Sequence, residues 1–319
     1  MSGGHKPVML EEVMAALAPR DGAIYVDGTF GGGGYSEALL ARAQCHVYGI
    51  DRDSEAIARG AALAGRYAPR LTLIHGRFSE MDTLLGACGV RRADGVALDI
   101  GVSSYQFDEA RRGFSFREDG PLDMRMDADA GETAADLLNT LSEAGLADIL
   151  RRYGEEKRAR TIAKAIVAAR PITRTAELAA IAERVLGKIP GRIHPATRTF
   201  QALRIAVNDE LGELERGLEA AERVLVPEGR LAVVSFHSLE DRIAKRFLAE
   251  RSGRVGRGSR HAPEAPSRLA SFRLAGKQPA LPSSAEIAAN PRARSARLRA
   301  AIRTSAPAQV HTARQGSQP

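Results

Sequence analysis

The sequence predicts an α/β protein built around a Rossmann-like, nucleotide-binding domain. Three observations support this prediction. A β-rich apolar run is followed at once by a glycine-rich turn and a helical pattern. Similar strand and helix patterns then alternate up to about residue 105. Acidic residues stand at the ends of several predicted strands, where open α/β sheets bind their ligands.

The glycine-rich turn, DGTFGGGGYS, covers residues 27–36 and directly follows the predicted strand Ala23–Asp27. Glycines let the backbone turn tightly and approach a ligand that a Cβ atom would push away. A helix is predicted over Ser36–Ala43, and the backbone N–H groups at its start are left to meet polar or negative ligand groups. We therefore predict a nucleotide site at this turn.

The class of nucleotide depends on the acidic residues nearby. The next predicted strand, His46–Ile50, is followed by Asp51, twenty positions after Gly31, where a carboxylate can accept hydrogen bonds from ribose hydroxyls. Dinucleotides and S-adenosylmethionine both fit this spacing. The dinucleotide motif is met poorly, because Ser36 stands where a third glycine or alanine is expected. Asp27 would also repel a pyrophosphate, whereas it suits a cationic ligand such as S-adenosylmethionine.

The strand and helix order indicates a parallel sheet with right-handed crossovers. A helix is predicted over Ser54–Ala64, followed by strands over Leu71–His75 and Gly95–Ile100. From about 133 to 226 the chain is almost entirely helical in pattern. The sheet pattern then resumes over Arg230–Phe236, after a Pro-Glu-Gly turn.

These changes in pattern predict an α/β domain interrupted by a helical insertion. Ser238 and Asp241 resemble a capping box that begins a further helix. Residues 252–271 and 304–319 have the composition of linkers or disordered segments. The expected organisation is a first part of the α/β domain over 1–109, a helical insertion over 110–210, a second part with a basic segment over 211–303, and a disordered tail over 304–319.

Charge and composition narrow the choice of partners. The net charge is +7, but residues 251–319 hold 13 Lys and Arg against 2 Asp and Glu, so the rest of the chain is net negative. This asymmetry predicts a polyanionic partner such as a nucleic acid. The chain has no apolar stretch long enough for a membrane span and no secretory h-region. We therefore expect a cytoplasmic protein, with Cys45 and Cys88 as reduced thiols and no metal site.

A second group of polar residues follows the predicted fourth strand. Asp99 stands at its carboxyl end, and Ser103, Ser104 and Gln106 come shortly after it. Ligands of open α/β sheets bind at this edge. We expect a substrate to meet the cofactor there.

The segment RGFSFREDGPLDMRM, residues 112–126, closely resembles a signature of the bacterial RsmH (MraW) methyltransferases. The resemblance extends over nearly the whole chain. Further matching segments are HKPVMLEEV at 5–13, YGEE at 153–156, HPATRTFQALRI at 194–205, SFHSLEDR at 235–242 and NPRARSA at 290–296.

This resemblance implies a class I methyltransferase fold with a helical insertion domain. We expect the insertion to cover the crevice and recognise the shape of the RNA, because of where it interrupts the sheet. It also implies transfer of a methyl group from S-adenosylmethionine to the N4 amino group of a cytidine in the decoding region of 16S ribosomal RNA. The partner would be 16S ribosomal RNA or the assembled small ribosomal subunit. The sequence leaves the oligomeric state open, with a homodimer among the alternatives.

The resemblance also implies particular site residues. The cofactor contacts carried over from the family are Gly33, Gly34, Tyr35, Asp51, Phe78, Asp99 and Gln106. Tyr35 departs from the histidine usual in the family, and Tyr105 and Phe107 depart from the usual proline and leucine. For the chemistry, we expect Asp99 and Ser103 to line the target amine, because its delocalised lone pair must be held toward the methyl group. Phosphate contacts are expected from Arg254, Arg257, Arg260, Arg292, Arg294, Arg297 and Arg299.

Three alternative functions remain on the sequence alone. An NAD-dependent oxidoreductase shares the first strand-turn-helix unit, but Asp27 and Ser36 count against it. A DNA amino-methyltransferase typically has an Asp/Ser-Pro-Pro-aromatic turn, where this chain has Asp99 followed by Ile-Gly-Val. A non-enzymatic RNA-binding protein explains the basic segment, but not the acidic residues at three strand ends.

Overall fold

The computed structural model describes residues 7–187, 194–254 and 269–309. The chain forms two compact units. The first contains the described parts of Met1–Asp51, Ala56–Ile100 and Leu214–Pro319, and the second contains Arg52–Glu55 and Gly101–Glu213. The second unit thus takes in residues on both sides of the expected insertion at 110–210. Most of the expected linker at 252–271, and the expected tail from residue 310 on, lie outside the described residues.

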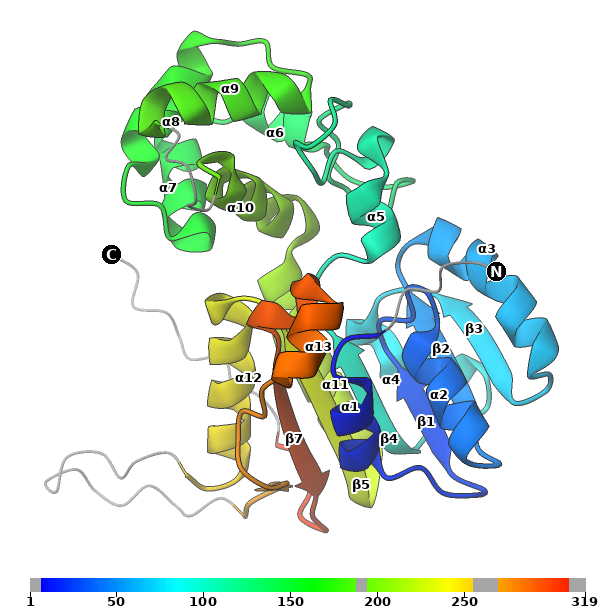
Figure 1. Cartoon of the computed structure of the whole chain (residues 1–319). Helices are drawn as coiled ribbons and strands as arrows, with labels where there is room; N and C mark the ends of the chain where they lie inside the picture. Colours follow the sequence, from blue (N-terminus) through cyan, green and yellow to red (C-terminus); the bar gives the residue numbers. More distant parts are fainter. Residues whose placement is uncertain (1–6, 188–193, 255–268, 310–319) are drawn as a thin grey trace, which may run out of the picture. The chain divides into compact units, whose positions relative to one another are not determined.

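The first unit is built on a seven-stranded sheet in the order β3-β2-β1-β4-β5-β7-β6 (Figure 1). Strands β1 to β5 pair in parallel, and β7 runs antiparallel to both β5 and β6. The strands are β1 (Ile24–Asp27), β2 (His46–Asp51), β3 (Leu71–His75), β4 (Ala93–Asp99), β5 (Leu225–Ser235), β6 (Phe272–Leu274) and β7 (Arg297–Arg303). The α/β, Rossmann-like fold class predicted from the sequence is confirmed.

Two features of the sheet differ from the sequence prediction. β5 begins at Leu225 rather than Arg230, because the expected Pro-Glu-Gly turn is an irregularity inside the strand, with Glu228 at a left-handed φ of 64°. There the register against β4 shifts between Ala93 and Gly95. Strands β6 and β7 were not expected at all. β7 lies in the arginine-rich segment that was expected to form a basic surface.

Helices cover both faces of this sheet. Side chains of α1 (Leu10–Leu17), α2 (Gly34–Arg42) and α3 (Ser54–Arg66) share one hydrophobic core with one face. Side chains of α4 (Met81–Ala87), α11 (Glu210–Val224) and α12 (Ser238–Arg251) share another core with the opposite face. This two-sided burial explains why strands such as β1 and β4 read as continuous apolar runs.

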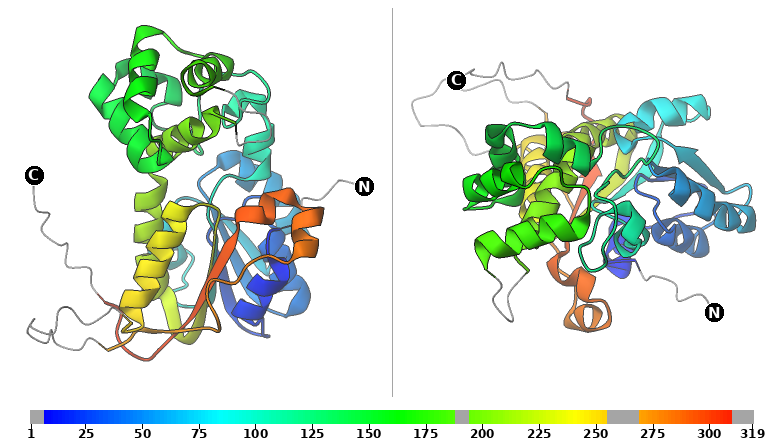
Figure 2. Two further views of the ribbon diagram at one scale, coloured as in Figure 1. Left: turned by 60° about the vertical axis from the view of Figure 1, so that its left-hand side comes forward. Right: turned by 90° about the horizontal axis from the view of Figure 1, so that it is seen from above.

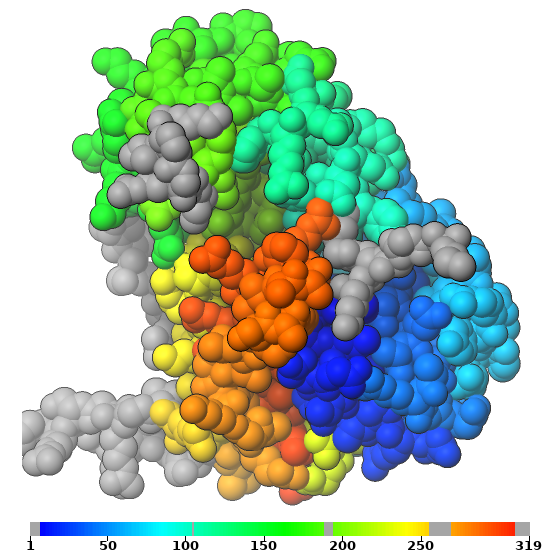
Figure 3. Space-filling model, viewed as in Figure 1, coloured from blue at the N-terminus to red at the C-terminus, as the bar shows by residue number. Residues whose placement is uncertain are grey.

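The N-terminal segment of the first unit is held by a short helix from near the other end of the chain. This helix, α13 (Ser284–Ala289), is followed by a 3-10 helix over Pro291–Ser295. The Glu286 carboxylate accepts a hydrogen bond from the Met9 backbone N–H at 2.6 Å. Figure 3 shows the surface of this segment beside that of α1.

The second unit is helical, as expected (Figure 2). It has its own hydrophobic core. Its helices are α5 (Ser104–Asp108), a 3-10 helix over Ala110–Arg112, α6 (Ala134–Thr140), α7 (Glu143–Gly154), α8 (Ala159–Ala168), α9 (Thr175–Leu186) and α10 (Ala196–Asn208). Leu138, Leu150 and Ile162 are fully buried in the core that these helices share. The apolar stripe of the insertion is therefore core. No helix among the described residues of either unit is long and apolar enough to cross a membrane.

Gly120 fixes the backbone of the second unit where two segments touch. A Cβ atom at Gly120 would lie 2.0 Å from the carbonyl oxygen of Ala110. We expect Gly120→Ala to lower the free energy of unfolding by at least about 2 kcal/mol, because backbone cannot move aside as a flexible side chain can. Gly65→Ala on α3 is the control, because the added Cβ would have no described atom within 4 Å apart from its chain neighbours and its own helix backbone. Equal thermal stability of the two variants would contradict this prediction.

Candidate functional site

Three acidic side chains lie at the carboxyl edge of the sheet. Asp27, Asp51 and Asp99 are the last residues of β1, β2 and β4. Strand β1 pairs with both of the other strands, and Asp27 stands opposite Gly49 and Ala97. The structure therefore brings these three predicted residues together at one edge, where parallel sheets bind ligands.

The glycine-rich loop joins this edge to α2. Gly33 precedes the helix with a left-handed φ of 77°, which favours glycine. The Gly31 N–H donates to the Asp51 carboxylate at 2.7 Å. A Cβ atom at Gly28 would lie 2.6 Å from the Leu98 side chain. The loop is thus packed closely against β4 and tied to the end of β2.

Two of the predicted loop contacts, Gly34 and Tyr35, face the protein interior in part. A Cβ atom at Gly34 would lie 2.1 Å from the Pro7 ring. The Tyr35 side chain is buried, and its hydroxyl donates to the Val8 carbonyl. Because the tyrosine ring belongs to the core, the departure from histidine need not alter a ligand contact. We expect any cofactor contact at Tyr35 to come from its backbone.

Asp99 has the most unusual environment of the three carboxylates. Its backbone N–H donates to the Thr29 hydroxyl at 2.7 Å. Its Oδ1 atom is buried and has no hydrogen-bond partner among the residues that the structure describes. Burial, with a smaller contribution from the charges of Asp27 and Glu240, raises the pKa of the Asp99 carboxyl to about 8. A buried, unpartnered oxygen is costly, so it marks a place where a ligand donor can bind.

Asp27 is partly committed to the protein. Its Oδ2 atom accepts hydrogen bonds from the Ser36 hydroxyl at 2.8 Å and from the Ser36 N–H at 3.2 Å. Burial raises the pKa of Asp27 to about 6, although the Ser36 hydrogen bonds oppose the shift. Two neighbouring carboxyls with raised pKa values would be stabilised in their ionised form by a cationic ligand.

Phe78 lies in a 3-10 helix over Phe78–Glu80, just after β3. Its ring packs against α11, where a Cβ atom at Gly217 would lie 2.2 Å from a ring carbon. The ring is only partly buried and contacts the core on one side. The predicted adenine contact of Phe78 therefore remains a prediction, supported by its place at the carboxyl edge.

Ser103 and Gln106 form a local group in the second unit. Ser103 is the N-cap of α5: its hydroxyl accepts the Gln106 N–H, and the Gln106 side-chain oxygen accepts the Ser103 N–H. The Gln106 amide nitrogen donates to Asp53 at 2.9 Å. Asp53 was not predicted from the sequence, although it lies only two residues after Asp51.

The helix after β5 begins one residue earlier than the sequence suggested. The expected capping box of Ser238 and Asp241 is wrong, because His237 is the N-cap and Glu240 closes the box. The buried Glu240 carboxylate accepts the Phe236 N–H at 2.8 Å and lies 2.8 Å from the His237 ring. The strand-end histidine is therefore engaged by the protein, with Glu240 as its partner.

One predicted phosphate contact is wrong. Arg299 is buried on β7, and its guanidinium donates two hydrogen bonds to Asp241. Arg297 also pairs with Asp241, but its side chain stays half exposed. Arg254, Arg292 and Arg294 are exposed, whereas Arg257 and Arg260 lie outside the described residues. The arginines of β7 occupy alternate positions and so share one face of the strand, where Asp241 and backbone carbonyls pair with them. The charge count did not take these partners into account.

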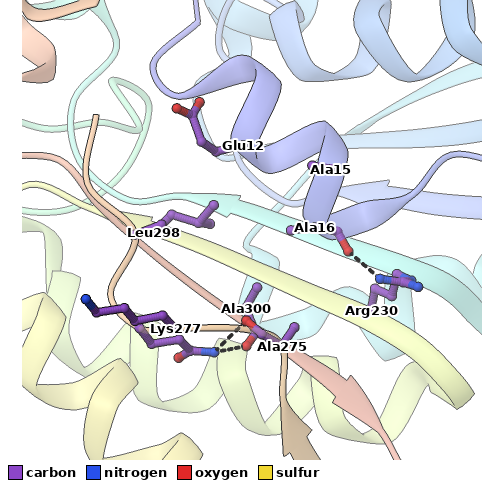
Figure 4. A pocket seen from close by; sticks show the side chains of 10 residues that line it. Glu12, Ala15, Ala16, Arg230, Ala275, Lys277, Leu298 and Ala300 are labelled. Atoms are coloured by element: carbon purple, nitrogen blue, oxygen red, sulfur yellow. Dashed lines mark hydrogen bonds between the residues drawn. The ribbon is translucent and has the colours of Figure 1, made fainter. Parts of the chain in front are cut away.

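The first unit also has an open cavity of about 340 Å³ away from these residues (Figure 4). Its walls include the helix α1 and strands β5 and β7, and half of the ten lining residues are alanine. Arg230 at its rim donates to the Ala16 carbonyl at 3.1 Å. The lining residues include none of the predicted site residues.

The sheet order with a reversed β7, the glycine-rich loop and the carboxylates at the strand ends define an α/β protein of the class I methyltransferase type. The chain belongs to the MraW methylase family, whose model matches residues 2–304. The family resemblance seen in the sequence motifs is therefore confirmed.

Curated relatives are similar over almost their full length. A protein of Rhodospirillum centenum named ribosomal RNA small subunit methyltransferase H is 62% identical over 308 residues, covering 95% of this chain and 93% of the relative. The protein of the same name from Paramagnetospirillum magneticum is 58% identical over 309 residues, covering 95% and 97%. Among solved structures, a putative rRNA-methylase from Clostridium thermocellum superposes with a TM-score of 0.44 at 12% identity, covering 94% of this chain and 100% of that one. The assignment rests on the sequence relatives and not on this remote likeness.

Proposed function

We propose that this protein is an S-adenosylmethionine-dependent methyltransferase that methylates the N4 amino group of a cytidine in the decoding region of small-subunit 16S ribosomal RNA. Membership of the MraW methylase family and relatives named ribosomal RNA small subunit methyltransferase H support the reaction and the RNA class. The same findings set aside an oxidoreductase, a DNA methyltransferase and a non-enzymatic RNA-binding protein. The choice of the N4 atom rests on the motif resemblance.

The residues present fit the cofactor. The Asp51 carboxylate can accept hydrogen bonds from the ribose hydroxyls, and α2 begins beside it with the backbone of Gly33–Tyr35. The raised pKa values of Asp27 and Asp99 favour a ligand that carries positive charge. When bound, S-adenosylmethionine supplies an electrophilic methyl group on a cationic sulfur.

The observation that carries the proposed chemistry is the unpartnered Oδ1 of Asp99. This oxygen can accept an N–H hydrogen bond from the target amine and turn its lone pair toward the methyl group. Holding the reacting groups in line can supply about 7–11 kcal/mol of the barrier. The Ser103 hydroxyl already accepts a hydrogen bond but can still donate one, so it can assist in orienting the base.

Cofactor binding should release protons at pH 7. Burial holds the pKa of free Asp99 near 8, so the carboxyl is mostly protonated, and a nearby cation lowers that pKa. We expect S-adenosylmethionine to release up to about one proton on binding. S-adenosylhomocysteine lacks the sulfonium charge and should release fewer. Calorimetry in buffers of different ionisation enthalpy measures the number of protons released by each ligand. An equal number for the two ligands would place the sulfonium away from Asp99.

Transfer of a labelled methyl group tests the whole proposal. The purified protein is incubated with S-adenosylmethionine and either free 16S ribosomal RNA or small subunits lacking the modification, and the nucleosides are analysed by mass spectrometry. N4-methylcytidine is the expected product. A methylated nucleoside of another kind would overturn the assigned atom, and no transfer to either acceptor would overturn the substrate.

Further parts of the proposal concern the setting of the reaction. We place the protein in the cytoplasm with ribosomal RNA. The exposed Arg254, Arg292 and Arg294 are candidate phosphate contacts, with binding that weakens as salt rises. The comparison of free RNA with small subunits in the transfer assay identifies the acceptor. A homodimer remains a prediction to be tested by sedimentation.

A further inference from the structure

A buried carboxylate that the sequence motifs do not assign lies at the centre of the second unit's polar contacts. Asp53 is fully buried. Its Oδ1 atom accepts the Glu55 N–H at 3.0 Å. Its Oδ2 atom accepts hydrogen bonds from the Gln106 side-chain amide at 2.9 Å and from Arg112 at 3.1 Å. Asp53 thus joins the start of α3 to the segment that carries Gln106.

Arg112 is the charge partner that makes this burial tolerable. Its guanidinium is nearly buried and donates to Asp53, to Glu55 and to two backbone carbonyls, those of Arg125 and Met126. An unpaired buried carboxylate is strongly unfavourable, so it needs a partner that is itself fixed. The four contacts of Arg112 fix the guanidinium in one position.

The contacts of Gln106 follow from the chemistry of Asp53. A carboxylate only accepts hydrogen bonds, so the amide nitrogen of Gln106 must face Asp53. The amide oxygen then faces the Ser103 N–H at 3.1 Å. The Ser103 N–H only donates and the Asp53 carboxylate only accepts, so the two groups together fix the orientation of the amide. These two bonds use half of the four that an amide can make, which leaves one N–H and one oxygen lone pair for a ligand.

We propose that Asp53 and Arg112 are positioning residues for the cofactor contact at Gln106. Together with the Ser103 N–H, they hold the Gln106 amide in one orientation and position. Asp53 is also two residues from Asp51 along the chain. This inference rests on the proposed function, in which Gln106 meets the cofactor.

A double-mutant cycle between Asp53 and Gln106 tests the proposal. Asp53→Asn keeps the size of the side chain and an oxygen that caps α3, but it turns an N–H₂ group toward the donors of Gln106 and Arg112. We expect Asp53→Asn to raise the Kd for S-adenosylhomocysteine about tenfold. Gln106→Ala should raise it similarly, and the double variant should be no weaker than Gln106→Ala alone. Arg111→Gln, an exposed neighbour, is the control and should leave Kd unchanged.

The outcomes separate this inference from the proposed function. Multiplicative losses in the double variant, or an unchanged Kd in Asp53→Asn, would show that Asp53 only supports the fold and would overturn the proposal. An unchanged Kd in Gln106→Ala would overturn it too, while methyl transfer by the wild-type protein would still support the proposed function. If Asp53→Asn does not fold, Arg112→Lys takes its place in the cycle. This variant keeps the charge but loses the bonds to the backbone carbonyls, and multiplicative losses with Gln106→Ala would again overturn the proposal.

Discussion

Replacing Asp99 with asparagine should lower kcat for methyl transfer by about 10²–10⁴-fold, because the ionised carboxylate is the proposed acceptor for the target amine. Asparagine can still present an oxygen, but that oxygen is uncharged and competes with its own N–H₂ group. The cofactor contacts of the glycine-rich loop and Asp51 remain. We therefore expect kcat to fall much more than KM for S-adenosylmethionine rises.

The same substitution should make the protein more stable at neutral and alkaline pH. Burial raises the pKa of Asp99 from 3.8 to about 8 in the folded state, so the folded protein holds a proton that the unfolded chain has lost. Stability from this group is therefore fully present below pH 3.8 and is lost as the pH rises toward 8. Because Asp99 is partly accessible, we expect Asp99→Asn to gain about 1–3 kcal/mol over wild type at pH 8.

Thermal unfolding of Asp99→Asn and wild type across pH 5 to 9 measures this effect. The difference in Tm should grow with pH and level off above about pH 8. A difference that does not change with pH would contradict the raised pKa of Asp99. An unchanged kcat would remove Asp99 from the chemistry, whatever the stability shows. A residue that lowers stability and raises activity is the usual compromise at an active site.

The parts of the fold that could be predicted are those set by local pattern. β1, β2 and β4 are short apolar runs buried on both faces, and each ends in an aspartate. Because parallel strands end at one edge, the sequence positions of Asp27, Asp51 and Asp99 were enough to predict that they lie together. The glycine-rich turn could also be predicted, because a run of glycines between a strand pattern and a helix pattern is a local signal.

The parts that could not be predicted depend on contacts between distant segments. β7 contains Arg299 and Arg303, whose charge suggests surface positions, but both are buried. Arg299 pairs with Asp241, and Arg303 donates to backbone carbonyls. Asp53 and Arg112 lie 59 positions apart in sequence, and only the folded chain joins them. A local charge pattern does not indicate which distant residue will pair with a buried charged side chain. The buried ion pairs were therefore the part of the structure that could not be predicted from the sequence.

Replacing Asp51 with alanine should weaken cofactor binding by at least about 100-fold, or about 2.7 kcal/mol. Two effects combine in this variant. The carboxylate proposed to accept the ribose hydroxyls is lost, and the Gly31 N–H loses the acceptor that holds the loop at 2.7 Å. Asp51→Asn keeps an acceptor for Gly31 and loses only the charge, so it should cost about tenfold.

Calorimetric titration with S-adenosylhomocysteine measures these losses, and Asp21 supplies a matched control. Asp21 also accepts a backbone N–H in a loop, that of Gln44 at 2.7 Å, but it precedes β1 at the amino edge of the sheet. Asp21→Ala should leave the Kd unchanged. If Asp21→Ala weakened binding as much as Asp51→Ala, the effect would come from loop stability, and the cofactor would not be bound through Asp51. A hundredfold loss in Asp51→Ala and a tenfold loss in Asp51→Asn, with no loss in Asp21→Ala, would instead place the ribose at the end of β2. Both aspartates hold a loop through a backbone N–H, so only a direct contact between Asp51 and the cofactor would explain the difference.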